Sequence, residues 1–121
     1  MKPVVMILGT DSSQSDRISG LLEINGYRPE ASDDFSILSG HLTDKPVSAV
    51  ILDLDAIAPD NHLFRLFKRN NPDTVLFAIS SESFHPDLKE SMEKYIFACM
   101  HKPVDPDEML FLLKSGFDKD I

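Results

Sequence analysis

The chain of 121 residues contains no tryptophan, only five glycines and a single cysteine, Cys99. One cysteine excludes an internal disulfide, which makes a reducing cytoplasm the expected location. No apolar run approaches the roughly 18 residues that a membrane-spanning helix requires, so we expect no membrane segment. Lys2 precedes the apolar run 4–8 without the small-residue cleavage pattern of a secretory signal. That run is therefore expected to be a first strand rather than a signal peptide.

Basic residues are also scarce, with 12 Lys and Arg against 20 Asp and Glu and a net charge of −8. Binding to nucleic acid rests largely on Lys and Arg that neutralise phosphates, so we expect no direct nucleic-acid binding by this chain. An apolar fraction of 42% excludes disorder on compositional grounds. The length predicts one domain over 1–121, either alone or as the N-terminal part of a longer protein.

Apolar runs alternate with segments of helical period along the whole chain. The runs lie at 4–8, 28–32, 47–52, 74–79 and 96–100, and the second of them is polar enough to indicate an edge strand. Five strand–helix repeats imply parallel strands joined by right-handed crossovers. We therefore predict an α/β fold, a doubly wound five-stranded parallel sheet in the flavodoxin-like order 2-1-3-4-5 with helices on both faces.

Polar residues that accept hydrogen bonds from free N–H groups indicate where helices begin. The expected caps are Ser12 or Ser13, Asp60 and Asp105. A second helix is expected to begin at Asp33 or Asp34. It would turn three apolar side chains toward the core, namely Phe35, Leu38 and Leu42.

Three polar side chains stand directly after the third, fourth and fifth strands: Asp53, Ser80 and Lys102. In an open α/β sheet the carboxyl ends of the strands border the ligand crevice. Each residue alone also fits a plain role, as a turn cap, a loop serine or a surface lysine. Together they suit phosphoryl transfer, because a carboxylate can attack phosphorus while an ammonium and a hydroxyl hold the phosphoryl oxygens.

The sequence resembles a known family over essentially its full length. The matching features are the run 50–52 before Asp53, then Ser80, and Lys102-Pro103 before the helix start 105–108. This family is the receiver domain of bacterial two-component response regulators. Segment 95–104 is also similar to the receivers attached to some ATPase-type transcription activators.

The resemblance implies that Asp53 is the phosphoacceptor and that Ser80, Ser81 and Lys102 interact with the phosphoryl group. It implies a cis peptide bond before Pro103. The expected partners are a histidine kinase and either a C-terminal output domain or a second copy of the chain. The expected chemistry is limited to self-phosphorylation and autodephosphorylation at the acceptor, so the chain is not expected to be an enzyme otherwise.

The sequence departs from the family pattern in the loop after the first strand. Gly9 and Thr10 stand where the family has an acidic pair that holds Mg²⁺. The expected metal ligands are then Asp11, Asp53 and Asp55, with Asp11 and Asp53 within reach of one cation. Two such carboxylates fall short of the family's three, so we expect Mg²⁺ to bind weakly.

The family also places an aromatic residue three positions before its lysine, where this chain has Cys99. Because Cys99 lies in an apolar run, a buried and unreactive thiol is expected.

Two other functions stay open. A phosphorylation-independent pseudo-receiver, a protein-interaction module of the same fold, would need no metal. A flavin or nucleotide carrier would use the hydroxyl-rich segment 10–15. That segment has little glycine, the chain has no G-x-G-x-x-G motif, and no tryptophan is present to stack on a flavin. The residues therefore favour the phosphoacceptor receiver, then the pseudo-receiver, then the carrier.

Overall fold

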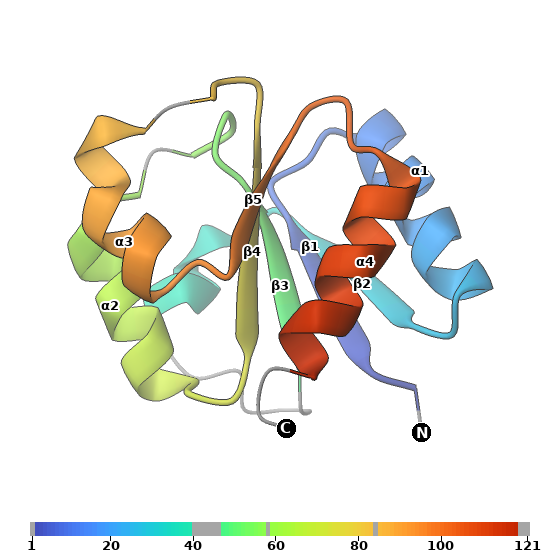
Figure 1. The fold of residues 1–121 in the computed structure, drawn as a ribbon, viewed down its shortest axis with the longest axis horizontal. Helices are drawn as coiled ribbons and strands as arrows, with labels where there is room; N and C mark the ends of the chain where they lie inside the picture. The colour runs from blue at the N-terminus through green and yellow to red at the C-terminus, as the bar shows by residue number, and fades with distance from the viewer. Residues whose placement is uncertain (1, 40–46, 58, 84, 119–121) are drawn as a thin grey trace.

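The computed structural model describes residues 2–39, 47–57, 59–83 and 85–118, which form a central sheet with helices on both faces (Figure 1). The strands are β1 (Val4–Leu8), β2 (Arg28–Ser32), β3 (Ala49–Asp53), β4 (Val75–Ser80) and β5 (Ala98–His101). The α-helices are α1 (Ser12–Ile24), α2 (Asn61–Asn70), α3 (Lys89–Lys94) and α4 (Pro106–Phe117), and two 3₁₀-helices are η1 (Phe35–Ser39) and η2 (Pro86–Leu88). Within these ranges no helix is long and apolar enough to cross a membrane.

The sheet has the predicted topology. Its order is β2-β1-β3-β4-β5, and every neighbouring pair is parallel. Every residue of β3 and β4 is buried, as expected for central strands covered on both faces. The polar β2 lies at one edge, where it pairs only with β1, and β5 lies at the other. The carboxyl ends of β1, β3, β4 and β5 therefore lie side by side at one rim of the sheet.

Two layers of helices cover the sheet. Helices α1 and α4 lie on one face, while α2, α3 and η1 lie on the other (Figure 1). Side chains of β3 alternate between the two resulting cores: Ala49 and Ile51 join one, and Val50 and Leu52 join the other. This alternation explains why the run has no polar position until the strand ends.

The residues that cap the helices agree in part with those predicted from the sequence. Asp60 caps α2 by accepting a hydrogen bond from Leu63 N, and Asp105 caps α4 by accepting one from Asp107 N. Both caps were predicted.

The second predicted helix appears in the described residues only as the 3₁₀-helix η1, in which Leu38 is buried and Phe35 half-buried. Asp34 Oδ1 there accepts hydrogen bonds from Ser36 N and Oγ. Such local side-chain hydrogen bonds compete with a regular α-helix. Leu42 lies outside the described residues.

A polar clamp joins α2 to the start of α3. Asn61 Oδ1 accepts hydrogen bonds from Ser91 N at 3.0 Å and from Ser91 Oγ at 2.6 Å. Asn61 Nδ2 donates to the Asp87 carbonyl at 3.1 Å. Arg65 forms a two-pronged ion pair with Glu90. The clamp thus fixes the helix that follows the β4 end of the crevice.

Replacing Phe67 by Ala should destabilise the fold strongly, because this fully buried ring lies in the core beneath α2. We expect the free energy of unfolding to fall by about 3–5 kcal/mol in urea titrations. Phe111→Ala is the matched control, since that ring is 69% exposed and its loss should cost less than about 0.5 kcal/mol. Equal effects of the two substitutions would contradict the described packing.

Candidate functional site

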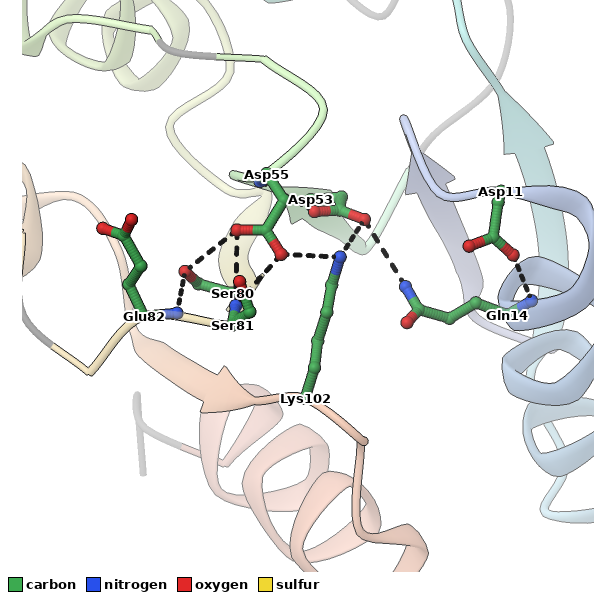
Figure 2. Close-up of polar contacts among 8 residues, drawn as sticks. All are labelled: Asp11, Gln14, Asp53, Asp55, Ser80, Ser81, Glu82 and Lys102. Atoms are coloured by element: carbon green, nitrogen blue, oxygen red, sulfur yellow. Dashed lines mark hydrogen bonds and ion pairs between the residues drawn. The ribbon is translucent and has the colours of Figure 1, made fainter.

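One ammonium and two carboxylates form the centre of the crevice at the carboxyl ends of the strands (Figure 2). Lys102 Nζ lies 2.7 Å from Asp53 Oδ2 and 2.9 Å from Asp55 Oδ2. Asp53 is only 3% exposed, whereas Asp55 stands on the exposed turn after β3. A buried carboxylate is costly unless it is paired, so Lys102 supplies the charge that lets Asp53 be buried.

The ends of two strands and one loop place these groups. Asp53 is the last residue of β3, and Lys102 directly follows the last residue of β5. The Lys102–Pro103 peptide bond is cis, as predicted. Arg17 of α1 donates to the Val104 carbonyl at 2.9 Å and so holds the loop after Lys102 against α1.

The end of β4 contributes a hydroxyl and a backbone N–H. Ser80 is fully buried, and its Oγ donates to Asp55 Oδ1 at 3.4 Å while accepting from Glu82 N at 3.0 Å. Ser81 N donates to Asp55 Oδ2 at 3.0 Å. The side chain of Ser81 is exposed. Ser81 therefore joins the site through its backbone rather than through its hydroxyl.

The first loop differs from the prediction. Asp11, rather than Ser12 or Ser13, caps α1 by accepting a hydrogen bond from Gln14 N at 2.8 Å. A carboxylate directly before a helix is attracted to the free N–H groups of the first turn and to the positive end of the helix dipole. Gln14 Nε2, instead of Asp11, reaches toward Asp53, with its amide 3.4 Å from Oδ2 (Figure 2).

The three expected metal ligands consequently do not gather around one possible metal position. Asp53 and Asp55 point at Lys102, while Asp11 caps α1. Within the described ranges, no group of three or more His, Cys, Asp or Glu side chains is placed to hold a metal ion. Mg²⁺ needs a near-octahedral set of oxygens, so these residues do not fit a Mg²⁺ site of the family type. The weak Mg²⁺ affinity stays a prediction.

The backbone conformation and the packing at Gly9 both disfavour an acidic side chain at this position. Its φ of 89° lies in the left-handed region, where side chains are disfavoured. A Cβ at this position would lie 2.9 Å from Phe35 Cε1. A carboxylate at position 9 would therefore require both the backbone and the Phe35 ring to move. Thr10, the other position of the acidic pair, likewise supplies no carboxylate.

The network also shifts proton affinities. The hydrogen bond from Lys102 holds the pKa of Asp55 below its usual range. Desolvation acts in the opposite direction, and the hydrogen bonds from Ser81 lower the pKa further. Desolvation lowers the pKa of Lys102, but its hydrogen bonds and charge interactions with Asp53 and Asp55 outweigh that effect, so the pKa is raised. Lys102 is therefore charged at neutral pH, as is Asp55.

Cys99 is exposed, so the prediction of a buried thiol was wrong. Its run is apolar, yet β5 is an edge strand, and the side that carries Cys99 opens to a groove with Pro86 and Met92. Partial desolvation and, second, the charge of Asp55 raise the pKa of the thiol, which keeps it protonated. No aromatic side chain stands at this position.

No protein-family model matches the chain, and no curated protein matches its sequence. Solved structures do match. The signal receiver domain of an HD domain-containing protein from Pseudomonas fluorescens Pf-5 has a TM-score of 0.81 at 16% identity, covering 98% of this chain and 97% of its own. A response regulator from Thermotoga maritima has a TM-score of 0.80 at 18% identity, covering 97% and 98%. The beryllofluoride-activated NtrC4 receiver domain dimer has a TM-score of 0.82 at 20% identity, covering 96% and 97%.

These structural neighbours are response-regulator receiver domains, and the chain has their CheY-like, flavodoxin-like fold. The likeness extends over nearly the whole chain, as the resemblance in sequence predicted.

Gln14 is the site residue that sequence reasoning missed. It occupies the third position of α1, after the Asp11 cap, in a spacing of the capping-box kind. In a capping box the third residue reaches back to the cap, but here its amide extends to Asp53. Its position in the sequence could have indicated this role, because Gln14 lies in the first turn of the helix that follows the carboxyl end of β1.

Replacing Lys102 by Met should leave the buried Asp53 charge without its ammonium. We expect the free energy of unfolding at pH 7 to fall by about 2–3 kcal/mol, less than for a fully buried pair because Lys102 is 21% exposed. Adding Asp53→Asn to this variant should recover part of the loss, since the charge that then lacks its ammonium is that of the exposed Asp55 rather than that of the buried Asp53. The control Lys89→Met removes an exposed lysine of α3. A loss of equal size in the control would contradict the claimed pairing.

The lowered pKa of Asp55 predicts a pH-dependent contribution to stability. A carboxylate with a depressed folded-state pKa stabilises the fold above its unfolded pKa, near 3.9, and the contribution disappears as pH falls through the folded value. The difference in unfolding free energy between wild type and Asp55→Asn should thus be at most about 1 kcal/mol at pH 7, because the pair is partly exposed. It should approach zero in urea titrations carried to low pH. A difference that grows on acidification would show that the ionised form is not the one stabilised.

Proposed function

We propose that the chain acts as a signal receiver in which Asp53 accepts a phosphoryl group from a phosphohistidine of a histidine kinase and relays the signal to a partner or output domain. The observation that carries the proposal is the 2.7 Å contact between Asp53 and Lys102, formed at the strand-end rim of a receiver fold. A carboxylate held beside an ammonium is both a nucleophile for phosphorus and a place where added negative charge is balanced.

In the transfer step a carboxylate oxygen of Asp53 attacks the phosphorus of the partner's phosphohistidine. The new O–P bond forms as the N–P bond breaks, and the electron pair of the broken bond stays on the imidazole nitrogen. The bound phosphoryl group adds about −1.5 to −2 charges. Lys102, which contacts Asp53 at 2.7 Å, would pair with its oxygens, and the amide of Gln14 would donate to the acceptor. A docked partner supplies the positioning that a small phosphoryl donor lacks.

The proposal includes no turnover of a separate substrate. Chemistry at Asp53 would be limited to gaining the phosphoryl group and losing it to water. A C-terminal output domain or a second copy of the chain would read the change. The NtrC4 receiver neighbour, described as a dimer in its activated form, supports the second of these partners.

One observation favours a second candidate, the phosphorylation-independent pseudo-receiver. Asp55 already engages Lys102, Ser80 Oγ and Ser81 N, which are the groups expected to hold a phosphoryl group. Nothing comparable favours a flavin or nucleotide carrier. The hydroxyl-rich segment 10–15 is mostly taken up by the first turn of α1.

Incubation of the protein with phosphorylated histidine kinases should add the mass of one phosphoryl group to the wild type. Asp53→Asn should take up none, because an amide is a poor nucleophile. Intact-mass spectrometry provides the measurement, with phosphoramidate as a kinase-independent donor.

Asp87→Asn is the matched control for that experiment, since it removes one exposed carboxylate from η2 and should be labelled like the wild type. Labelling of Asp53→Asn at the wild-type rate would place the phosphoryl group elsewhere. A wild type that no donor labels would favour the pseudo-receiver.

A further inference from the structure

The carboxylate of Asp55 gathers donors from two strand ends other than its own. Its oxygens lie 2.9 Å from Lys102 Nζ, 3.0 Å from Ser81 N and 3.4 Å from Ser80 Oγ. Figure 2 shows the carboxylate between the ammonium on one side and the end of β4 on the other. An ammonium, a backbone N–H and a hydroxyl around one anionic group constitute an anion-recognition set.

The turn after β3 does not require the Asp55 carboxylate for its own hydrogen bonds. Asp53 Oδ1 accepts from Asp55 N at 2.8 Å, and the Asp53 carbonyl accepts from Ala56 N at 3.3 Å. Asp53 thus accepts from the N–H groups of Asp55 and Ala56, and the Leu54 N–H donates to the Ile79 carbonyl at 2.9 Å. The Asp55 side chain instead reaches across the rim to β4 and to the loop after β5.

A phosphoryl group on Asp53 would compete with Asp55 for these donors. Ser81 offers a single N–H, which cannot donate fully to two anions at once. Lys102 has three N–H donors, of which contacts with Asp53 and Asp55 engage two. The negative charge of Asp55 would also repel an incoming phosphoryl group.

We infer that Asp55 is an internal anionic ligand of the phosphoryl-recognition donors, so that the resting domain already holds Lys102 and Ser81 around an anion and phosphoryl uptake must displace Asp55. The competition with a phosphoryl group rests on the proposed function of Asp53. The occupation of the donors by Asp55 does not rest on it. The chemical class that would replace Asp55 is a phosphate-like oxyanion.

The test removes the Asp55 carboxylate and asks whether an external oxyanion takes its place. The variant is Asp55→Ala, with Asp55→Asn as a second variant that keeps the shape of the side chain. Asp87→Ala is the matched control, because Asp87 lines the same cavity beside Asp55 and its loss changes the net charge equally. The probe is inorganic phosphate, and its binding is measured through the ¹⁵N–¹H resonance of the Ser81 amide.

In Asp55→Ala, phosphate should shift the Ser81 amide resonance with a midpoint concentration at least about tenfold lower than in wild type. This is the effect expected when a charged hydrogen-bond partner that competes with phosphate is removed. Asp87→Ala should behave like the wild type. Phosphoramidate labelling of Asp53, followed by intact mass, should also be about tenfold faster in Asp55→Ala.

The outcomes separate this inference from the proposed function. If the Ser81 amide responds to phosphate equally in wild type, Asp55→Ala and Asp87→Ala, the inference is overturned. Equal labelling rates for wild type and Asp55→Ala would also overturn it while leaving Asp53 as the acceptor. If phosphate binds only to the Asp55 variants but no variant is ever labelled, Asp55 is the internal ligand and the phosphoacceptor proposal fails.

Discussion

A carboxylate buried at the end of a central strand needs a positive partner, and the rim of this sheet is arranged around that need. Asp53 closes β3, and Lys102 follows β5, so β4 lies between them. The Lys102 side chain therefore reaches across the end of β4 to Asp53. The strand order brings the pair together, and the cost of an unpaired buried charge makes their contact favourable.

The same network distinguishes this crevice from a cation site. One ammonium contacts two carboxylates, and an amide from the first turn of α1 donates to Asp53. A side chain at position 9 would meet the Phe35 ring on a strained backbone, and Asp11 caps the helix start. Asp53 is thus paired with the ammonium of Lys102 and accepts a hydrogen bond from the neutral amide of Gln14. Lys102 thus pairs with Asp55 as well as with the proposed acceptor.

The fold followed from local features of the sequence. Runs such as 50–52 are too apolar for any position but a covered strand, and the strand–helix alternation leaves few topologies once right-handed crossovers are required. The end-of-strand rule then brought Asp53, Ser80 and Lys102 to one rim. These inferences held because they depend on periodicity and chain direction, which are properties of contiguous residues.

Only the tertiary structure decided which partner each polar group takes. The sequence allowed Asp11 to be either a helix cap or a metal ligand, and in the structure it caps α1, whose N–H groups are adjacent in the chain. Asp55 found Lys102 and the backbone of Ser81 across two strands, which no local pattern encodes. The exposure of Cys99 likewise depends on β5 being an edge strand. The sequence by itself determined the sheet and the groups at its rim, whereas pairing and exposure depend on distances between segments far apart in the chain.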